Sequence, residues 1–304
     1  MRKFQVTEAF RAYAKINLFL DIVDRRPDGY HNIRSIMQTV DLFDTVELTV
    51  SEERSNDLKI EISCDRPGVL CDSKNLAYRA AECFYRALGT FRDTRISIQK
   101  RIPMEAGLAG GSTDAAAVFS GLNSMLGLPF STEELCALGK TLGADIPFCI
   151  RGGTAEVSGI GDRLKQLPRL VKLPMVVVKH GEGVSTPQAY RALDTLYHDF
   201  TEQNGEGTAP DGVYQALIEG IRSENASLIT DNLYNVFENV VLPIHSCAKH
   251  LKEALVSYGA KTALMSGSGP SIVAFFADLE AAKGAADRLN REIGSVVAFA
   301  VLPV

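Results

Sequence analysis

Residues 107–112 read Gly-Leu-Ala-Gly-Gly-Ser, and the segment DAAAVFSGLNSML (114–126), which has the composition of a helix, follows almost directly. Glycines let backbone N–H groups approach a phosphate closely and adopt positive φ angles. A helix that starts there points its unpaired N–H groups and its positive dipole end at the same anion. Ser112 and Thr113 add hydroxyl donors. The stretch favours a phosphate-binding loop over a plain strand-to-helix turn, and we expect its glycine-rich part to be irregular.

The loop matches no standard nucleotide-binding motif. A Walker loop needs G-x-x-x-x-G-K-[ST]; Gly139-Lys140-Thr141 supplies the end of it, but Glu134 stands in place of the first glycine. The Rossmann spacing, the H-R-D and D-F-G signatures of protein kinases and the G-x-S-x-G elbow of serine hydrolases are missing from the sequence.

The composition is that of a globular protein. A chain of 304 residues suggests one large domain or two of ordinary size. Hydrophobic residues at 46% and charged residues at 23% argue against disorder. The net charge of −5 gives no support for a nucleic-acid or membrane-surface binder, although a local site can still hold an anionic substrate.

The cysteines and the N-terminus indicate a reducing compartment. None of the six cysteines forms a C-x-x-C pair, and six are too few for a disulfide scaffold, so we expect buried free thiols. The segment MRKFQVTEAFRAYAK lacks the apolar run of a signal peptide, and no stretch approaches 18 apolar residues. We therefore expect a cytoplasmic protein without a transmembrane helix.

Hydrophobic alternation predicts strands in the first half of the chain. In the strand expected over 9–23, the even positions from 14 to 20 are apolar, whereas Lys15, Asn17 and Asp21 share the other face. Further strands of an antiparallel sheet are expected over 33–40, 45–51 and 57–63, and one more over 95–101. Helical spacing covers 75–88, and a capping box opens a helix from 131 to about 142.

The second half predicts both element types. Strands are expected over 154–158, 173–180, 261–265, 271–277 and 295–302, with helices near 213–222, 246–258 and 278–292. The polar residues 201–212 read as a surface loop or a disordered insertion. The mixture is an α+β pattern without a steady βαβα rhythm, with a domain boundary between 150 and 172.

A few polar residues are candidates for chemistry. Lys15 on a strand would most often be solvated, and Asp145 in LGADIPFC would often be only a turn residue. A carboxylate beside a lysine, however, could form the acid–base centre of a phosphoryl transfer. Tyr30-His31 could stack on an aromatic ligand, and SGSGP (266–270) could be a second anion-binding nest or a tight turn.

Together these pieces resemble the GHMP kinases, which include galactokinase, homoserine kinase and mevalonate kinase. That family carries P-x-G-x-G-L-G-G-G-S-S-D-A-A, and residues 103–116 read PMEAGLAGGSTDAA. Six further segments match in the expected order: AKINLFL (14–20), R-x-DGYH (26–31), NL-x-YRAA (75–81), LGADIPF (142–148), GIGD (159–162) and MSGSGPS (265–271).

The resemblance implies an α+β fold of two lobes. Residues 1–160 would form an N-terminal lobe like domain 2 of ribosomal protein S5, and residues 161–304 a ferredoxin-like C-terminal lobe, with ATP and substrate between them. The implied activity is phosphorylation of an alcohol with ATP and Mg²⁺. The DGYH turn is typical of members that act on the 2-hydroxyl of cytidine diphosphate-linked methylerythritol, in non-mevalonate isoprenoid synthesis. A homoserine or mevalonate type of kinase and a non-catalytic nucleotide sensor are the alternatives.

The resemblance also implies residue roles. Asp145 would be the general base, and Lys15 would keep that carboxylate ionised and stabilise the attacking oxygen. Asn17 would help to place the substrate. Tyr30 would stack on cytosine, and His31 would hydrogen-bond it. Thr186 and Tyr190 would complete the substrate site, with Tyr190 on the other side of the base. The residues that would wrap the ATP phosphates are Pro103, Met104, Glu105, Ala106, Gly107, Leu108, Ala109, Gly110, Gly111, Ser112 and Thr113.

Two loop residues depart from the family pattern. Glu105 stands where the family often has Gly or Ala, and an acid there repels phosphates unless it points to solvent or toward Mg²⁺. Ala109 replaces a loop glycine, a change that suits only a negative φ. No carboxylate stands out as a Mg²⁺ ligand, so we expect phosphates and water to hold the metal. The sequence does not define the oligomeric state.

Overall fold

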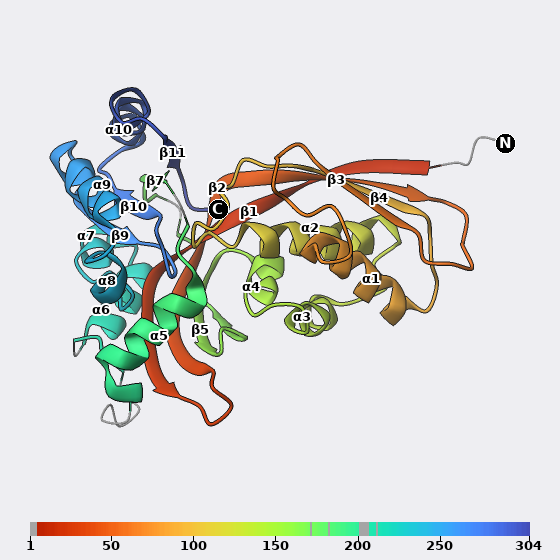
Figure 1. Cartoon of the computed structure of the whole chain (residues 1–304), viewed down its shortest axis with the longest axis horizontal. Helices are drawn as coiled ribbons and strands as arrows, with labels where there is room; N and C mark the ends of the chain where they lie inside the picture. Colours follow the sequence, from red (N-terminus) through yellow and green to blue (C-terminus); the bar gives the residue numbers. More distant parts are fainter. Residues whose placement is uncertain (1–4, 171, 182, 201–206, 211) are drawn as a thin grey trace. The chain divides into compact units, whose positions relative to one another are not determined.

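A computed structural model describes residues 5–170, 172–181, 183–200, 207–210 and 212–304 (Figure 1). Most of the loop expected over 201–212 lies outside these residues. The chain forms two compact units that interleave along the sequence. The first comprises the described residues up to Ala14, Leu42–Ile102 and Ala109–Gly152, and the second Lys15–Asp41, Pro103–Leu108 and the described residues from Gly153 onward. The continuous lobes 1–160 and 161–304 therefore remain a prediction about sequence segments.

Two long strands dominate the first sheet. β1 (Gln5–Arg25) and β2 (His31–Ser51) pair with each other, and each contributes residues to both units. The strand order is β3-β4-β2-β1-β8, and β5 pairs with both β2 and β6. The sequence predicted β1 in part and split β2 into two strands. The shorter strands are β3 (Ile60–Cys64), β4 (Thr94–Gln99), β5 (Thr154–Gly159), β6 (Arg163–Gln166) and β8 (Tyr234–Asn235).

The expected antiparallel pairing of the segment 57–63 is wrong. β3 pairs with β4 in parallel, with Ile62 opposite Ile96. Helix α1 (Leu76–Leu88) lies between the two strands in the sequence and contacts β3. Such a crossover returns the chain to the end of the sheet where the first strand began, which makes the second strand parallel. The order strand–helix–strand in the sequence was therefore an indication of parallel pairing.

Four helices build the core of the first unit. They are α1, α2 (Gly110–Met125), α3 (Thr132–Lys140) and α4 (Ile146–Arg151). Figure 1 shows them on one side of β3 and β4, and α2 contacts each of the other three. Their buried faces are rich in alanine and phenylalanine. The predicted capping box of α3 is confirmed, because the Ser131 side chain accepts from the Glu134 N–H and the Glu134 carboxylate accepts from the Ser131 N–H.

The expectation that the glycine-rich residues are irregular is wrong at one end. α2 begins at Gly110 and includes Gly111. A methyl group built on Gly110 would lie only 3.3 Å from the Ile102 side chain. Small residues let the helix start close against the strand end, and this packing offsets the poor helix propensity of glycine.

The second unit contains a four-stranded antiparallel sheet. Its order is β11-β7-β10-β9, from the strands β7 (Met175–His180), β9 (Thr262–Met265), β10 (Ile272–Phe275) and β11 (Val296–Val301). Numbered by sequence within the sheet, this order is 4-1-3-2, that of a ferredoxin-like fold. Helix α10 (Leu279–Glu292) packs on β7 and β11, and α9 (Ser246–Ser257) packs on β9 and β10.

The remaining helical elements of the second unit are short. The segment 213–222 was predicted as a helix, whereas the others were not. Pro187 at the start of α5 and the polar residues around α7 and α8 obscured their periodicity. The elements are α5 (Thr186–Leu196), the 3₁₀ turn η1 (His198–Phe200), α6 (Val213–Arg222), α7 (Ala226–Thr230) and α8 (Glu238–Val241).

The six cysteines are free, as expected, but they are not buried. Cys71 and Cys247 are exposed, and the other four are half-buried. Cys64, Cys71 and Cys247 lie at element ends or in a loop, whereas the other three lie within helices. Among the described residues, no helix combines the length and the apolar character needed to span a membrane.

Candidate functional site

The backbone of the glycine-rich loop takes up the left-handed region at three alternate residues. The φ angles are 50° at Glu105, 69° at Gly107 and 59° at Ala109. Ala109 is the left-handed N-cap of α2, so the condition under which alanine would fit here without strain, a negative φ, is not met. A non-glycine residue there carries about 1 kcal/mol of strain. The structure thus keeps the shape of a glycine loop at positions where the sequence has other residues.

Within the second unit, the loop packs against the SGSGP segment (266–270). A methyl group on Gly107 would lie 2.2 Å from the Ser266 carbonyl oxygen, so only glycine fits there. The Ser266 hydroxyl donates to the Gly107 carbonyl at 3.2 Å, and the Lys15 N–H donates to the Leu108 carbonyl at 3.2 Å. The Lys179 ammonium donates to the Met104 carbonyl. These contacts fix the carbonyl groups of the loop and explain both glycine-rich segments together.

The N-terminus of α2 has the features of an anion site. Within the described residues, no side chain caps this helix, so its first N–H groups are not used by a cap. Thr113 is buried, and its hydroxyl donates to the Gly110 carbonyl at 2.8 Å. Ser112 is half-buried beside Gly143, since a methyl group on that glycine would lie 4.0 Å from the Ser112 hydroxyl. The segment that leads to Asp145 therefore runs beside the first turn of α2.

Asp145 directly precedes α4 in the first unit. It is half-buried, and its backbone is helical, with φ −79° and ψ −18°. Its carbonyl accepts from the Cys149 N–H at 3.0 Å, but its carboxylate makes no capping hydrogen bond to the described helix. The carboxylate therefore does not cap the start of α4. The roles of general base and of turn residue both stay predictions for Asp145.

Lys15 lies on β1 in the second unit and is 5% exposed. Its ammonium donates to the Asn17 Oδ1 at 2.8 Å. The Asn17 Nδ2 in turn donates to the Ser35 Oγ at 2.8 Å, and that hydroxyl donates to the Phe19 carbonyl at 2.5 Å. Both faces of β1 are buried here, so the alternative of a solvated lysine is wrong. Because Lys15 and Asp145 belong to different units, their pairing stays a prediction.

The aromatic candidates belong to the second unit. Tyr30 is 63% exposed at the end of the turn before β2, whereas His31 is buried. The Tyr190 ring lies 4.9 Å from the His31 ring at an interplanar angle of 32°, and 4.9 Å from the Phe237 ring. Tyr190 thus packs directly on His31. The sequence analysis placed Tyr190 only on the other side of the base and did not predict this contact.

Asp194 holds the His31 ring. The His31 Nε2 lies 2.6 Å from the Asp194 Oδ1, and one turn of α5 separates Asp194 from Tyr190. If the His31 Nε2–H donates a hydrogen bond to the Asp194 carboxylate, Nδ1 of the neutral ring is left as an acceptor. Sequence analysis missed Asp194, because α5 was not predicted and no local pattern links Asp194 to His31. Thr186, at the start of α5, shares a hydroxyl–hydroxyl hydrogen bond of 2.8 Å with Ser268.

Sequence analysis also missed three charged residues of the first unit, Asp44, Lys100 and Asp114, which we call the ionic cluster. Asp44 is fully buried on β2, and Asp114 is 4% exposed on α2. The Lys100 ammonium donates to both carboxylates, at 2.8 Å to Asp114. A signal was available for two of them, since Asp114 belongs to the quoted glycine motif and Lys100 stands just before it, whereas Asp44 had none.

The electrostatics of the ionic cluster are unusual. Burial raises the pKa of Asp114 to about 7; Lys100 opposes this shift, and the nearby Asp44 adds to it. Burial alone would lower the pKa of Lys100, but the two carboxylates together raise it above its ordinary value. Lys100 therefore stays charged, whereas Asp114 changes its charge near neutral pH.

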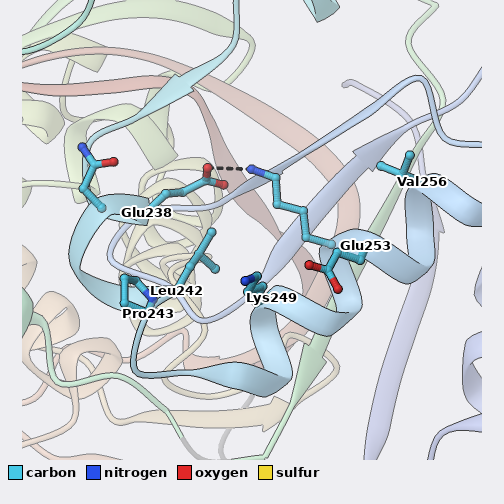
Figure 2. A pocket seen from close by; sticks show the side chains of 8 residues that line it. Glu238, Leu242, Pro243, Lys249, Glu253 and Val256 are labelled. Atoms are coloured by element: carbon cyan, nitrogen blue, oxygen red, sulfur yellow. Dashed lines mark hydrogen bonds and ion pairs between the residues drawn. The ribbon is translucent and has the colours of Figure 1, made fainter.

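A separate groove lies between α8 and α9 in the second unit (Figure 2). Its volume is about 860 Å³, and Leu242, Pro243 and Val256 form much of its apolar wall. The Glu238–Lys252 ion pair crosses it, with 2.6 Å between Oε2 and Nζ. Its described lining includes none of the predicted site residues, so it does not contribute to the candidate site.

Comparison with known proteins accounts for the fold and for the loop. The model of the GHMP kinases N terminal domain matches residues 75–153, and that of the GHMP kinases C terminal domain matches residues 214–295. The chain belongs to the GHMP kinase family. It is therefore an ATP-dependent small-molecule kinase, and the predicted family and α+β fold class are confirmed.

Two relatives and one crystal structure that this chain resembles have equivalent names. A Clostridium beijerinckii protein called 4-diphosphocytidyl-2-C-methyl-D-erythritol kinase is 38% identical over 289 residues, 94% of this chain and 97% of the relative. A Clostridium perfringens protein of the same name is 41% identical over 92% of each chain. A crystal structure of 4-(cytidine 5'-diphospho)-2C-methyl-D-erythritol kinase superimposes with a TM-score of 0.78 and 31% identity, covering 98% of this chain and 100% of that one.

Proposed function

We propose that this kinase transfers the γ-phosphoryl group of ATP to the 2-hydroxyl of 4-diphosphocytidyl-2-C-methyl-D-erythritol, a step of non-mevalonate isoprenoid biosynthesis. The observation that carries the proposal is the identity of 38% and 41% to enzymes of that name over more than nine-tenths of the chain. The R-x-DGYH turn, with Tyr30 exposed beside the buried His31, supports a cytidine-containing substrate.

In the proposed reaction, Asp145 is the general base. It takes the proton from the substrate 2-hydroxyl as that oxygen bonds to the γ-phosphorus, and the bond from that phosphorus to the bridging oxygen breaks to release ADP. Lys15 stabilises the negative charge on the attacking oxygen. The burial of Lys15 and its bond to Asn17 support this role, because a fixed charge acts strongly where water is excluded. Asn17 helps to place the substrate.

Residues 103–113 would bind the ATP phosphates. The uncapped N-terminus of α2 offers N–H groups, and Ser112 offers a hydroxyl. Glu105 is exposed, which supports the expectation that its carboxylate avoids the phosphates by facing solvent. Gly107 is required for the approach of the loop to Ser266.

The cytosine site would use the aromatic group of the second unit. Tyr30 would stack on the base, an interaction that every exposed ring can provide. Asp194 would keep the proton of His31 on Nε2, so that Nδ1 accepts from the amino group of cytosine. Tyr190 would border the base while it supports His31, and Thr186 would contact the substrate from the start of α5.

We propose that Mg²⁺ enters with ATP. Over the described part of the chain, no group of three or more His, Cys, Asp or Glu side chains forms a metal site. Mg²⁺ retains water and binds phosphate oxygens readily, so the nucleotide and water would supply its ligands. When bound, the ion neutralises the charge of the phosphates.

The free thiols support a reducing compartment, for which we propose the cytoplasm.

An ADP-release assay tests the function. The protein is mixed with Mg·ATP and, in separate reactions, with 4-diphosphocytidyl-2-C-methyl-D-erythritol, homoserine or mevalonate. We expect turnover with the cytidine compound alone. Turnover with another alcohol would overturn the substrate and the roles of Tyr30 and His31. Binding of ATP without turnover on any alcohol would favour a nucleotide sensor instead.

A further inference from the structure

The ionic cluster contacts both ends of the phosphate loop. At the entrance, one oxygen of Asp44 accepts the N–H groups of Arg101 at 2.5 Å and Ile102 at 2.8 Å. These residues come immediately before Pro103, where the loop begins. The other oxygen of Asp44 accepts from the Lys100 ammonium. The start of the loop is thus fixed to a fully buried carboxylate on β2.

At the exit, Lys100 holds the first turns of α2. Its ammonium donates to the Asp114 Oδ2 at 2.8 Å, and Asp114 is the fifth residue of the helix. A methyl group on Gly110 would lie 3.3 Å from this ammonium, so Lys100 lies directly against the first residue of α2. One side chain therefore links the entrance of the loop to its exit.

Stability alone is a poor explanation for this arrangement. Buried ion pairs often contribute little net stability, because the cost of removing charges from water offsets their attraction. Here two carboxylates share one ammonium, and the Asp114 Oδ1 has no hydrogen-bond partner among the described residues. Because the cluster is costly to bury and lies between the two loop ends, a role in holding those ends in fixed positions explains it better.

We propose that Lys100 is a positioning residue for ATP. By joining Asp44 at the entrance to Asp114 on α2, it fixes the direction of the N–H groups at the helix start, where the phosphates would bind. The inference rests on the proposed function only in that residues 103–113 hold a nucleotide; it does not depend on which alcohol is phosphorylated. Lys100 and its partners do not touch the reacting atoms in this proposal.

Two variants at position 114 isolate the link to α2. Asp114→Asn and Asp114→Ala remove the same charge, but only asparagine keeps an oxygen that can accept from Lys100. Binding of Mg·ADP is measured by titration calorimetry at one pH and one salt concentration. We expect Asp114→Ala to bind about tenfold more weakly than Asp114→Asn, the effect of one lost hydrogen bond to a charged donor. The KM for the alcohol substrate should be the same in both.

Three further variants test the role of Lys100 itself and supply a control. Lys100→Met should weaken Mg·ADP binding at least as much as Asp114→Ala, while Lys100→Arg should restore much of it. Glu133→Ala removes an exposed ion pair with Arg151 of 2.9 Å between α3 and α4 and should leave binding unchanged. If Lys100→Met does not fold, the comparison of Asp114→Ala with Asp114→Asn tests the proposal.

The outcomes separate this proposal from the proposed function. Equal affinity of folded Asp114→Ala and Asp114→Asn for Mg·ADP would overturn the positioning role. Loss of thermal stability in Asp114→Ala without a change in that affinity would overturn it too, since a purely structural cluster behaves in that way. If the wild-type protein binds Mg·ADP but does not phosphorylate the cytidine compound, only the proposed substrate fails, and the affinity comparison still stands.

Discussion

The phosphate loop and the turn that carries Tyr30 differ in the chemical groups that would contact a ligand. The loop would bind through backbone N–H groups, and its shape depends on positive φ angles, on Gly107 against Ser266 and on a buried ionic cluster. The turn instead presents an exposed aromatic ring next to a buried histidine that is held by Asp194. Backbone binding is therefore set by the fold, whereas aromatic binding is set by single side chains that can be removed one at a time.

The largest expected effect lies outside both binding regions. If the loop and the turn serve only binding, a substitution of Asp145 should abolish the chemical step and leave ligand binding intact. Asp145→Asn should lower kcat by about 10³-fold, within the range for loss of a general base, and leave the affinity for Mg·ATP within about twofold. Single-turnover kinetics and nucleotide titration measure the two quantities. Substantial residual activity would remove Asp145 from the role of base.

The turn should respond to the loss of one ring. Tyr30→Ala should raise the KM for the cytidine substrate by about 10- to 100-fold, because stacking on a base contributes roughly 1–3 kcal/mol. The KM for ATP should change little. Since Tyr30 is 63% exposed, the fold should not be disturbed, and Tyr30→Phe serves as the control that keeps the ring. An unchanged KM for the cytidine substrate would contradict the stacking role.

The two regions also differ in how far the sequence predicted them. The loop was recognised because glycine spacing before a helix is a local signal, and the strand over 9–23 was recognised from its alternation. The parallel pairing of β3 and β4 was predicted wrongly, since pairing depends on how α1 crosses the sheet. The burial of both faces of β1 around Lys15 was equally hidden, because an alternating pattern predicts one solvent-exposed face.

Contacts between distant segments explain most of what the sequence did not reveal about the site. Asp44 and Lys100 are 56 residues apart, and His31 and Asp194 are 163 apart, so no local pattern joins them. The sequence did not reveal the positive φ at Ala109 for a related reason. The packing of the loop fixes its backbone, and the residue tolerates the conformation that the family usually assigns to glycine.

The ionic cluster should make stability depend on pH. A carboxyl whose pKa is raised from 3.8 to about 7 on folding adds stability below pH 4, and this contribution is lost as the pH rises through 7. Relative to Asp114→Asn, the wild-type Tm should therefore fall by about 4 °C between pH 5.5 and 8. Thermal melts of both proteins across this range measure the difference, in which other titrating groups cancel. A difference that does not vary with pH would contradict the raised pKa of Asp114.

The smallest expected effect tests the backbone of the loop. Ala109→Gly should raise stability by about 0.5 kcal/mol, because relief of the left-handed strain slightly exceeds the greater freedom of glycine in the unfolded chain. Ala117→Gly, in the interior of α2, is the matched control and should lower stability by about 1 kcal/mol or more. Urea unfolding measures both changes. Opposite signs at two alanines eight residues apart would show that the loop shape is imposed by the fold, whereas destabilisation at both would mean that Ala109 does not carry the strain that its φ of 59° implies.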